Sequence, residues 1–457
     1  MYRRRHFDMI KIEKDWYGDQ DSLNEKLSIL GSKILAKRNS RDRTVAEVEK
    51  ILADEKYDGK IVDLTFAELK RKLQNDELTP YEVLLAYLDR ALTAHSTGGL
   101  TQFINKPAAQ DCNLVQKFKS AGAVPFLRTN VPTTGMSIGS CNPIYGATRN
   151  PFDPERSPGG STSGEAALIA LHGSPLGVGS DIGGSVRTPA HWSGICSLKP
   201  TTDRFTLKGH PCSMRNLFMI PGAGGLLSRD VEGLVEGFRM FWTGESCDNQ
   251  NVPMPFNENL YTSNEKLTIG YYEYDGYIEA APACRCVVRM AVEILKSKGH
   301  RMVPFSVPDV SRMMQIYKGL LYPDNMQHHL ETIDREFCEK THFQGWFNDP
   351  LVDHSKIKFA KVESKNDYFN LCDQFLAYRE NFARVLKSAG IDCLICPVSA
   401  FTAPPLDQPP LLHCWGWNYC ALYNFLDYPA GVVPMNLVNE GDEAELAQFG
   451  LGDGVTE

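Results

Sequence analysis

The sequence predicts an α/β fold in which a mixed, largely parallel sheet is wrapped by helices and preceded by a helical N-terminal region. Three observations predict it: apolar, strand-like runs alternate with helical runs, a long charged amphipathic stretch comes first, and no tandem repeat interrupts the alternation. The chain has 457 residues, 42% of them hydrophobic and 23% charged, which suits a soluble globular protein with a large core.

Helix signals dominate the first quarter of the chain. Residues 18–56 carry leucine and isoleucine at helical spacing among charges, which is typical of an amphipathic helix. Thr65 and Glu68 have the spacing of a capping box, and Thr79-Pro80 repeats a helix start with proline in the first turn. The elements predicted here are helices over 18–56, from 65, over 80–92 and over 111–120, and the entry into a buried strand at 121–127.

Strands and helices alternate more clearly in the second half. Glycine stops two helices, at Gly299 and Gly390, and Pro397 ends the last strand. The predicted elements are a helix over 165–171, strands over 266–272, 302–305 and 391–396, and helices over 285–297 and 369–389. The more polar residues 308–368 suggest a surface insertion, and the acidic, glycine-containing end from Glu440 suggests poor order. We therefore expect a helical region over 1–60, a main domain over 61–440 and an acidic tail over 441–457.

The net charge of −8 argues against a nucleic-acid partner, which would need a basic face. Thirteen cysteines without framework spacing favour free thiols and a reducing, intracellular compartment, cytoplasmic or peripheral to an internal membrane. Neither a signal peptide nor a run long enough for a transmembrane helix is present. The basic start, Met1–Phe7, favours a solvated tip, and a weak peripheral membrane contact stays open. Cys393 and Cys396 lack the further ligands that a zinc site needs.

The most informative residues are two serines, Ser161 and Ser185, each directly after Gly-Gly and 24 positions apart. Glycine allows a backbone to approach a ligand closely, and a serine on such a loop offers a nucleophile beside N–H donors for an oxyanion. The glycines do not fit a dinucleotide fingerprint, a phosphate-binding loop or a nucleophile elbow, because all three fail on spacing. A purely structural glycine turn is the alternative. The pattern indicates a serine hydrolase without a catalytic histidine.

Residues 157–202 resemble the amidase signature family, and within it the fatty acid amide hydrolases. The shared stretches are Ser-Pro-Gly-Gly-Ser ending at Ser161, Asp-Ile-Gly-Gly-Ser-Val-Arg over 181–187 and Gly-Ile-Cys-Ser-Leu-Lys-Pro-Thr over 194–201. Weaker similarity in the same order extends from about Asp63 to Pro434.

The resemblance implies the amidase signature fold and hydrolysis of a carbon–nitrogen amide, in particular of a fatty acid amide to acid and amine. It assigns Ser185 as the nucleophile that forms an acyl-enzyme, and Ser161, usually in a cis peptide, as the proton relay. The remaining residues that it assigns are the oxyanion donors Ile182, Gly183, Gly184 and Ser185, and an acyl-chain wall at Gly135 or Met136. It implies a small acyl amide as partner and no metal or organic cofactor; a homodimer stays open.

The chain departs from the family at the third catalytic residue, a lysine in a Gly-Val-Pro-x-x-x-Lys segment. No such segment is present, because the helix over 80–92 leads almost directly to Asp111, and the main domain is to that extent incomplete. Lys106, Lys117 and Lys119 lie nearby without that context, and Arg128 cannot lose its proton. Two alternatives therefore remain: a catalytically impaired binding or regulatory protein, and a generic amidase, since 308–368 lack the long apolar helix of the lipid-amide members.

Five other positions carry hypotheses. Asp181 and Arg187 bracket the second serine loop, and we interpret them as a pair that orients it, with solvated charges as the alternative. His172, at a helix end, favours a structural role over a histidine-based triad. Trp415 and Trp417 fit an acyl pocket and ordinary core packing equally well.

Overall fold

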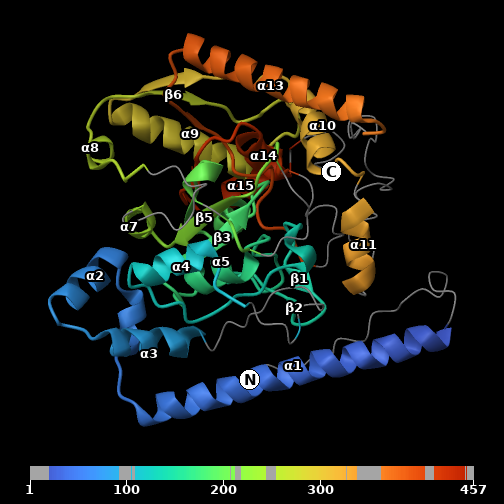
Figure 1. The fold of residues 1–457 in the computed structure, drawn as a ribbon. Coiled ribbons are helices and arrows are strands. Elements are labelled where there is room, and N and C mark those ends of the chain that lie inside the picture. The colour runs from blue at the N-terminus through green and yellow to red at the C-terminus, as the bar shows by residue number, and fades with distance from the viewer. Residues whose placement is uncertain are drawn as a thin grey trace.

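The computed structural model describes residues 20–91, 104, 109–205, 207–210, 218–242, 254–325, 327–336, 362–406, 416–447 and 449. Figure 1 shows two sheets with helices on all sides, the long α13 along one end of the molecule and α1 along the opposite end. In the described ranges, no helix combines the length and the apolar character that crossing a bilayer demands.

A four-stranded antiparallel sheet carries the glycine-rich segment. Its strands, in spatial order, are β3 (Leu176–Asp181), β5 (Ala223–Ser228), β4 (Cys196–Lys199) and β9 (Ala430–Val432). β3 and β5 pair along their whole length, from Leu176 opposite Ser228 to Asp181 opposite Ala223. All six β5 residues are buried, because helices cover both faces of this sheet.

A second, three-stranded sheet is parallel, in the order β7 (Arg301–Pro304), β6 (Thr268–Tyr271) and β8 (Cys393–Ile395). The helix α9 (Pro282–Ser297) links β6 to β7, and α13 (Lys365–Ser388) precedes β8, so each parallel pair has the crossover that it needs. The predicted mixed α/β fold is thus confirmed, with parallel pairing confined to this sheet. A short hairpin, β1 (Cys141–Asn142) and β2 (Gly146–Ala147), stands apart.

Helices α5 (Ser163–Ala170) and α6 (Arg187–Trp192) pack on the four-stranded sheet through an apolar cluster that includes Ile169, Val186 and Leu227. α4 (Asn113–Ser120) and α7 (Val231–Trp242) enclose a cluster of buried phenylalanines. Its rings are Phe118, Phe205, Phe238 and Phe241. The predicted helices over 111–120 and 165–171 are confirmed within two residues at each end.

The largest core cluster lies between α10 (Val310–Leu321), α13 and α14 (Asn418–Phe425). Met313 and Tyr317 of α10 are 0% exposed, so α10 is a core helix and not part of a surface insertion. The prediction for 308–368 was wrong there, because α10 turns an apolar stripe inward at positions that polar neighbours interrupt in the sequence. α11 (Gln327–Glu336) follows it, and residues 337–361 lie outside the described part of the chain.

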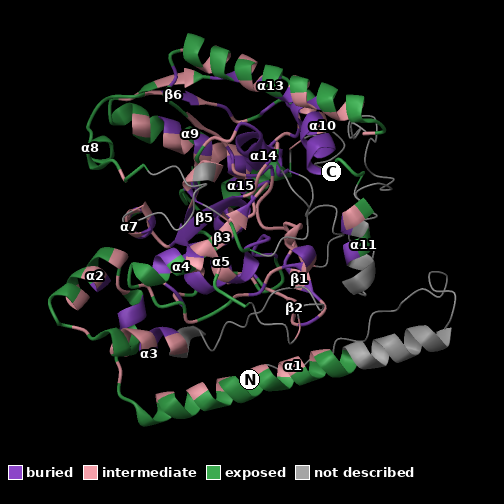
Figure 2. Cartoon of the chain, viewed as in Figure 1, coloured by how far each residue is buried: buried purple, intermediate pink, exposed green. Residues whose placement is uncertain are grey.

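The N-terminal helices follow the sequence prediction. They are α1 (Gln20–Asp54), α2 (Phe66–Gln74) and α3 (Pro80–Ala91), with the short turn η2 (Gly59–Asp63) between the first two. The Thr65–Glu68 capping box forms at the start of α2. Over residues 31–54, α1 is mostly exposed, as Figure 2 shows, and it is tied to the body where Arg38 Nε donates to the Ile144 carbonyl at 2.6 Å.

Two predicted segments differ in the structure. Residues 121–127 form no strand: Pro125 has no N–H to donate to a ladder, and Val124 is 67% exposed. The acidic end from Glu440 is not simply disordered, because α15 (Glu440–Leu446) forms with a capping box between Asn439 and Asp442 and packs on α9. The remaining short elements are η4 (Thr133–Gly135), η5 (Thr202–Arg204) and α8 (Glu258–Tyr261).

Candidate active site

The first serine loop ends at the start of α5. The Gly160–Ser161 peptide is cis, as the resemblance implies, and Ser161 is 5% exposed. A Cβ at position 160 would lie 2.2 Å from the Gly139 carbonyl oxygen and 2.7 Å from that of Ser137. Glycine is therefore required at 160 for steric reasons, which explains why this serine follows Gly-Gly.

The second serine loop connects the end of β3 to the start of α6. Gly184 has φ of +119°, a conformation that side chains rarely adopt, and a Cβ there would lie 2.7 Å from Cys420 Cβ. Ser185 follows it and is partly exposed. The amide of Thr162 donates to the Ser185 carbonyl at 3.1 Å, so the two serine loops are directly joined.

A buried carboxylate organises this loop. Asp181, 0% exposed, accepts hydrogen bonds from the amides of Gly184 (2.9 Å) and Val186 (3.1 Å) and a two-nitrogen ion pair from Arg187 (2.9 and 3.0 Å). Burial disfavours the charge, but Arg187 and the Asn424 amide still hold the pKa of Asp181 below its ordinary value. The predicted orienting pair is confirmed.

The same contacts correct one predicted oxyanion donor. The Gly184 amide points to Asp181 and is occupied there, so it is not available to a ligand. Ile182, Gly183 and Ser185, the residues of the other predicted donors, line the pocket described next. The glycine at 184 serves the tight turn rather than the oxyanion.

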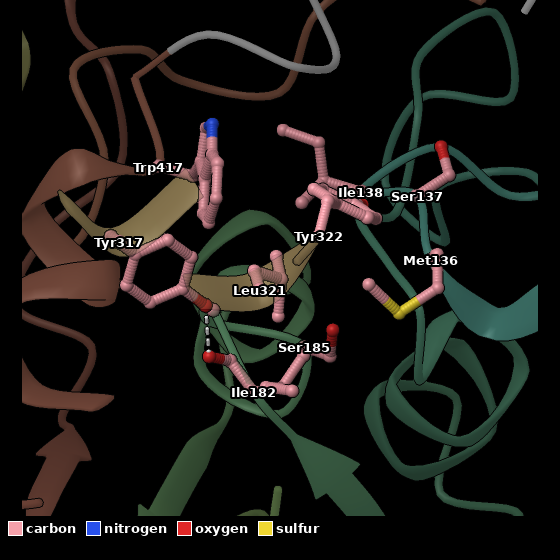
Figure 3. Close-up of a pocket in the computed structure, with 10 residues that line it drawn as sticks. Met136, Ser137, Ile138, Ile182, Ser185, Tyr317, Leu321, Tyr322 and Trp417 are labelled. Carbon is pink, nitrogen blue, oxygen red and sulfur yellow. Dashed lines mark hydrogen bonds between the residues drawn. The ribbon is translucent and has the colours of Figure 1, made fainter. Parts of the chain in front are cut away.

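A small, largely apolar pocket opens directly over Ser185, with a cavity volume of about 40 Å³. Figure 3 shows aromatic and aliphatic side chains from distant parts of the chain converging on it. Its lining residues are Met136, Ser137, Ile138, Ile182, Gly183, Ser185, Tyr317, Leu321, Tyr322 and Trp417. The arrangement places the Ser185 hydroxyl at one end of a largely apolar pocket, which suits a ligand with one polar group and an apolar extension.

The sequence left open which of several candidate residues line this pocket, and the structure distinguishes between them. Met136 lines it, whereas Gly135, with φ of +69°, supplies the turn before it. Trp417 lines the pocket and also belongs to the largest core cluster, so this tryptophan combines pocket lining with core packing. Trp415 lies outside the described residues.

Within the described part of the chain, no lysine or histidine is hydrogen-bonded to the hydroxyl of Ser161 or Ser185. The buried Lys117 donates to the Phe241 carbonyl at 3.1 Å, and Lys119 pairs with Asp111 at 2.9 Å. Lys106 lies outside the described residues.

The two histidines near the loops have structural roles. His191 bonds the Phe401 carbonyl at 3.3 Å, and burial lowers its pKa to about 4, which keeps it neutral. The Nδ1 atom of His172 lies 3.0 Å from Asp63 Oδ1 and 2.8 Å from Arg229 Nη1. Neither serves the serines.

Sequence reasoning missed two charged residues close to the loops, the buried Lys199 and the half-buried Glu165. Lys199, 1% exposed at the end of β4, donates to the Pro200 carbonyl, and burial together with Arg187 lowers its pKa to about 8. Burial raises the pKa of Glu165 in α5 to about 7, although its carboxylate accepts a 2.8 Å bond from Thr129. A charged residue inside an otherwise apolar run was the signal available in both cases. Among the described residues, no group of three or more histidine, cysteine, aspartate or glutamate side chains could hold a metal.

Comparisons with known proteins agree with this geometry. The family model described as Amidase matches residues 91–455. Fatty acid amide hydrolase 1 of Caenorhabditis elegans is 30% identical, over 94% of this chain and 87% of that protein. Fatty-acid amide hydrolase 1 of Sus scrofa is 33% identical, and the match covers 78% of this chain and 64% of that protein.

Solved structures agree on the fold. A fatty acid amide hydrolase structure superposes with a TM-score of 0.71 at 24% identity, over 84% of this chain and 77% of that one. A 6-aminohexanoate cyclic dimer hydrolase, complexed with substrate, superposes with a TM-score of 0.66 at 19% identity, over 83% of this chain and 91% of that one.

Proposed function

Because the chain belongs to the amidase family, hydrolases that act on amide carbon–nitrogen bonds, we propose that it cleaves acyl amides through an acyl-enzyme on Ser185. One observation carries the proposal: Ser185 stands at the floor of an apolar pocket, beside the amide of Gly183 and joined to the Ser161 loop. This arrangement supports the proposal that Ser185 acts as nucleophile with neighbouring amides as oxyanion donors and Ser161 as relay.

In the proposed reaction the Ser185 hydroxyl attacks the amide carbonyl carbon, and the carbonyl oxygen becomes an oxyanion that accepts bonds from the Gly183 and Ser185 amides. Ser161 passes the proton of the nucleophile to the leaving nitrogen, so that the amine departs neutral. Water then attacks the ester carbon of the acyl-enzyme, and the ester carbonyl oxygen becomes an oxyanion that accepts the same two N–H bonds. The carbon–oxygen bond to Ser185 breaks, the free acid is released, and the proton lost by the water passes to the serine oxygen.

The pocket lining supports an apolar acyl group as the part of the substrate held beside Ser185. Aliphatic and aromatic surface is offered by Met136, Ile138, Leu321 and Trp417. The charged pair Asp181–Arg187 is buried and absent from the pocket lining. Two relatives are named as fatty acid amide hydrolases, which favours a fatty acyl chain over a polar acid.

A second candidate function follows from a specific observation, the absence of a lysine or histidine bonded to either serine hydroxyl in the described ranges. On this account the chain binds acyl amides with little turnover. Loss of a general base typically costs about 10²–10⁴-fold in rate, so a slow residual hydrolysis would be expected.

Product formation separates the two candidates. The purified chain is incubated with a long-chain acyl amide, and the free acid is quantified for wild type, Ser185→Ala and the exposed-site control Ser297→Ala on α9. We expect acid release that only Ser185→Ala abolishes. Saturable binding of the amide without acid release above the Ser185→Ala background would favour the binding function and contradict the hydrolase.

A further inference from the structure

Tyr317 makes an unusual contact for a core aromatic residue, because its hydroxyl reaches the backbone of the nucleophile loop. Its side chain on α10 is 0% exposed, and the hydroxyl donates to the Ile182 carbonyl at 2.5 Å (Figure 3). The ring stands edge-on to Trp417, with the centroids 5.2 Å apart, so packing holds the hydroxyl in this direction.

The bond acts on a peptide unit that the proposed chemistry uses. In the trans peptide between Ile182 and Gly183 the carbonyl and the N–H point in opposite directions, so fixing the carbonyl on Tyr317 fixes where the Gly183 N–H points. A Cβ on Gly183 would lie 3.2 Å from the Tyr317 oxygen and 2.7 Å from the Trp417 ring. Both aromatic side chains therefore pack closely against Gly183.

The hydrogen bonds that Asp181 makes on the other side of the loop do not orient the Ile182–Gly183 peptide. The Asp181 carboxylate holds the amides of Gly184 and Val186, downstream of the peptide in question. The Ile182 carbonyl is instead held from α10, an element 135 residues away in the sequence.

We propose that Tyr317 is a positioning residue for the oxyanion site: it orients the Ile182–Gly183 peptide and strengthens the Gly183 N–H as a donor. A hydrogen bond to a carbonyl polarises the amide, so the N–H at the other end of the peptide binds developing negative charge more strongly. The inference rests on the proposed function, since it concerns the oxyanion formed on Ser185.

The bond itself can be tested without any activity. The sequence contains three Ile-Gly pairs, 138–139, 182–183 and 269–270, so a chain labelled with carbonyl-¹³C isoleucine and ¹⁵N glycine gives three carbonyl–amide cross-peaks. Tyr317→Phe should move the Ile182–Gly183 peak and leave the Ile269–Gly270 peak, on the other sheet, in place. An unmoved Ile182–Gly183 peak would overturn the inference.

The consequence for chemistry is tested by the rate at which a fluorophosphonate labels Ser185. Tyr317→Phe should slow labelling about tenfold. It should also weaken the binding of an alkyl trifluoromethyl ketone, which forms a tetrahedral oxyanion on the serine, by a similar factor. The KM for an acyl amide should change little. Tyr378→Phe is the matched control, because this buried tyrosine of α13 also donates to a backbone carbonyl, that of Pro308, away from the loop.

The outcomes are distinguishable. A raised KM with an unchanged labelling rate would mean that Tyr317 only shapes the pocket, and an equal loss in Tyr378→Phe would mean a general packing effect; either result overturns the inference alone. An unlabelled wild type would overturn the proposed function and the catalytic part of this inference together, and the Ile182–Gly183 peak would still report whether the bond exists.

Discussion

The backbone amide of Thr162 donates to the backbone carbonyl of Ser185 at 3.1 Å, so the loop that carries the proposed relay is bonded to the residue proposed as nucleophile. This bond makes the two Gly-Gly-Ser segments one structural unit. A displacement of either loop is therefore expected to reach the other.

The lack of space for a side chain at Gly160 provides a test of whether the two serine loops form one structural unit. Gly160→Ala would place a Cβ 2.2 Å from the Gly139 carbonyl oxygen, a backbone atom that cannot give way alone. We expect a loss of about 3 kcal/mol or more in the free energy of unfolding, of the size seen for overpacked sites, and loss of Ser185 labelling. Gly59→Ala is the control, because a Cβ there meets nothing within 4 Å. Urea unfolding of both variants measures the difference, and equal stabilities would contradict the clash.

The buried Asp181–Arg187 pair should be costly to break. Arg187→Met removes the guanidinium and leaves the Asp181 carboxylate buried without its ion pair, which typically costs about 3–5 kcal/mol. Arg289→Met, which breaks the more exposed pair with Glu273, should cost less than about 1 kcal/mol. Chemical denaturation at neutral pH compares the two, and a mild effect of Arg187→Met would show that the pair does not hold the loop.

Glu165 predicts a pH dependence of stability. Burial raises its pKa from 4.5 to about 7, so the fold favours the protonated acid. The stabilisation from this group is fully present below pH 4.5 and is lost as the pH rises through about 7, a change on the order of 3 kcal/mol. Glu165→Gln should therefore show a smaller fall in unfolding free energy between pH 4.5 and 8 than wild type. Glu293→Gln, exposed on α9, should behave like wild type, and parallel pH profiles for all three proteins would refute the assignment.

The apolar pocket predicts a dependence on acyl length. Each additional buried methylene contributes about 0.8 kcal/mol, so kcat/KM should rise about fourfold per methylene until the pocket is filled. Ile138→Trp places a larger side chain in the pocket, so kcat/KM should stop rising at shorter acyl chains. Ile294→Trp, at a position 44% exposed on α9, should leave the acyl-length dependence unchanged. A kcat/KM independent of acyl length would argue for a substrate held outside this pocket.

Much of the fold could be predicted locally. The capping box at Thr65 and the glycine stop at Gly390 are short-range signals, and the helices they bound are present. The segment 121–127 was misassigned because an apolar run alone does not reveal whether a neighbouring strand will pair with it. The core helix α10 was mistaken for surface because only its packing against α13 and α14 shows which of its faces is buried.

The candidate site likewise has features that could be predicted from local sequence and features that could not. Ser161 and Ser185 could be found from their Gly-Gly context, and the Asp181–Arg187 pair from its position around the loop. The role of Gly184 could not, because its amide is taken by a side chain three residues earlier only once the loop is folded. The contribution of Tyr317 depends on a contact across 135 residues that no motif records.

The most direct test of the account is the mass of the intact chain after reaction with a fluorophosphonate, followed by mapping of the modified peptide. The account predicts a single adduct on Ser185 that is absent from Ser185→Ala and forms more slowly in Ser161→Ala. A folded wild-type chain that gains no adduct, or gains one that persists in Ser185→Ala, would contradict it.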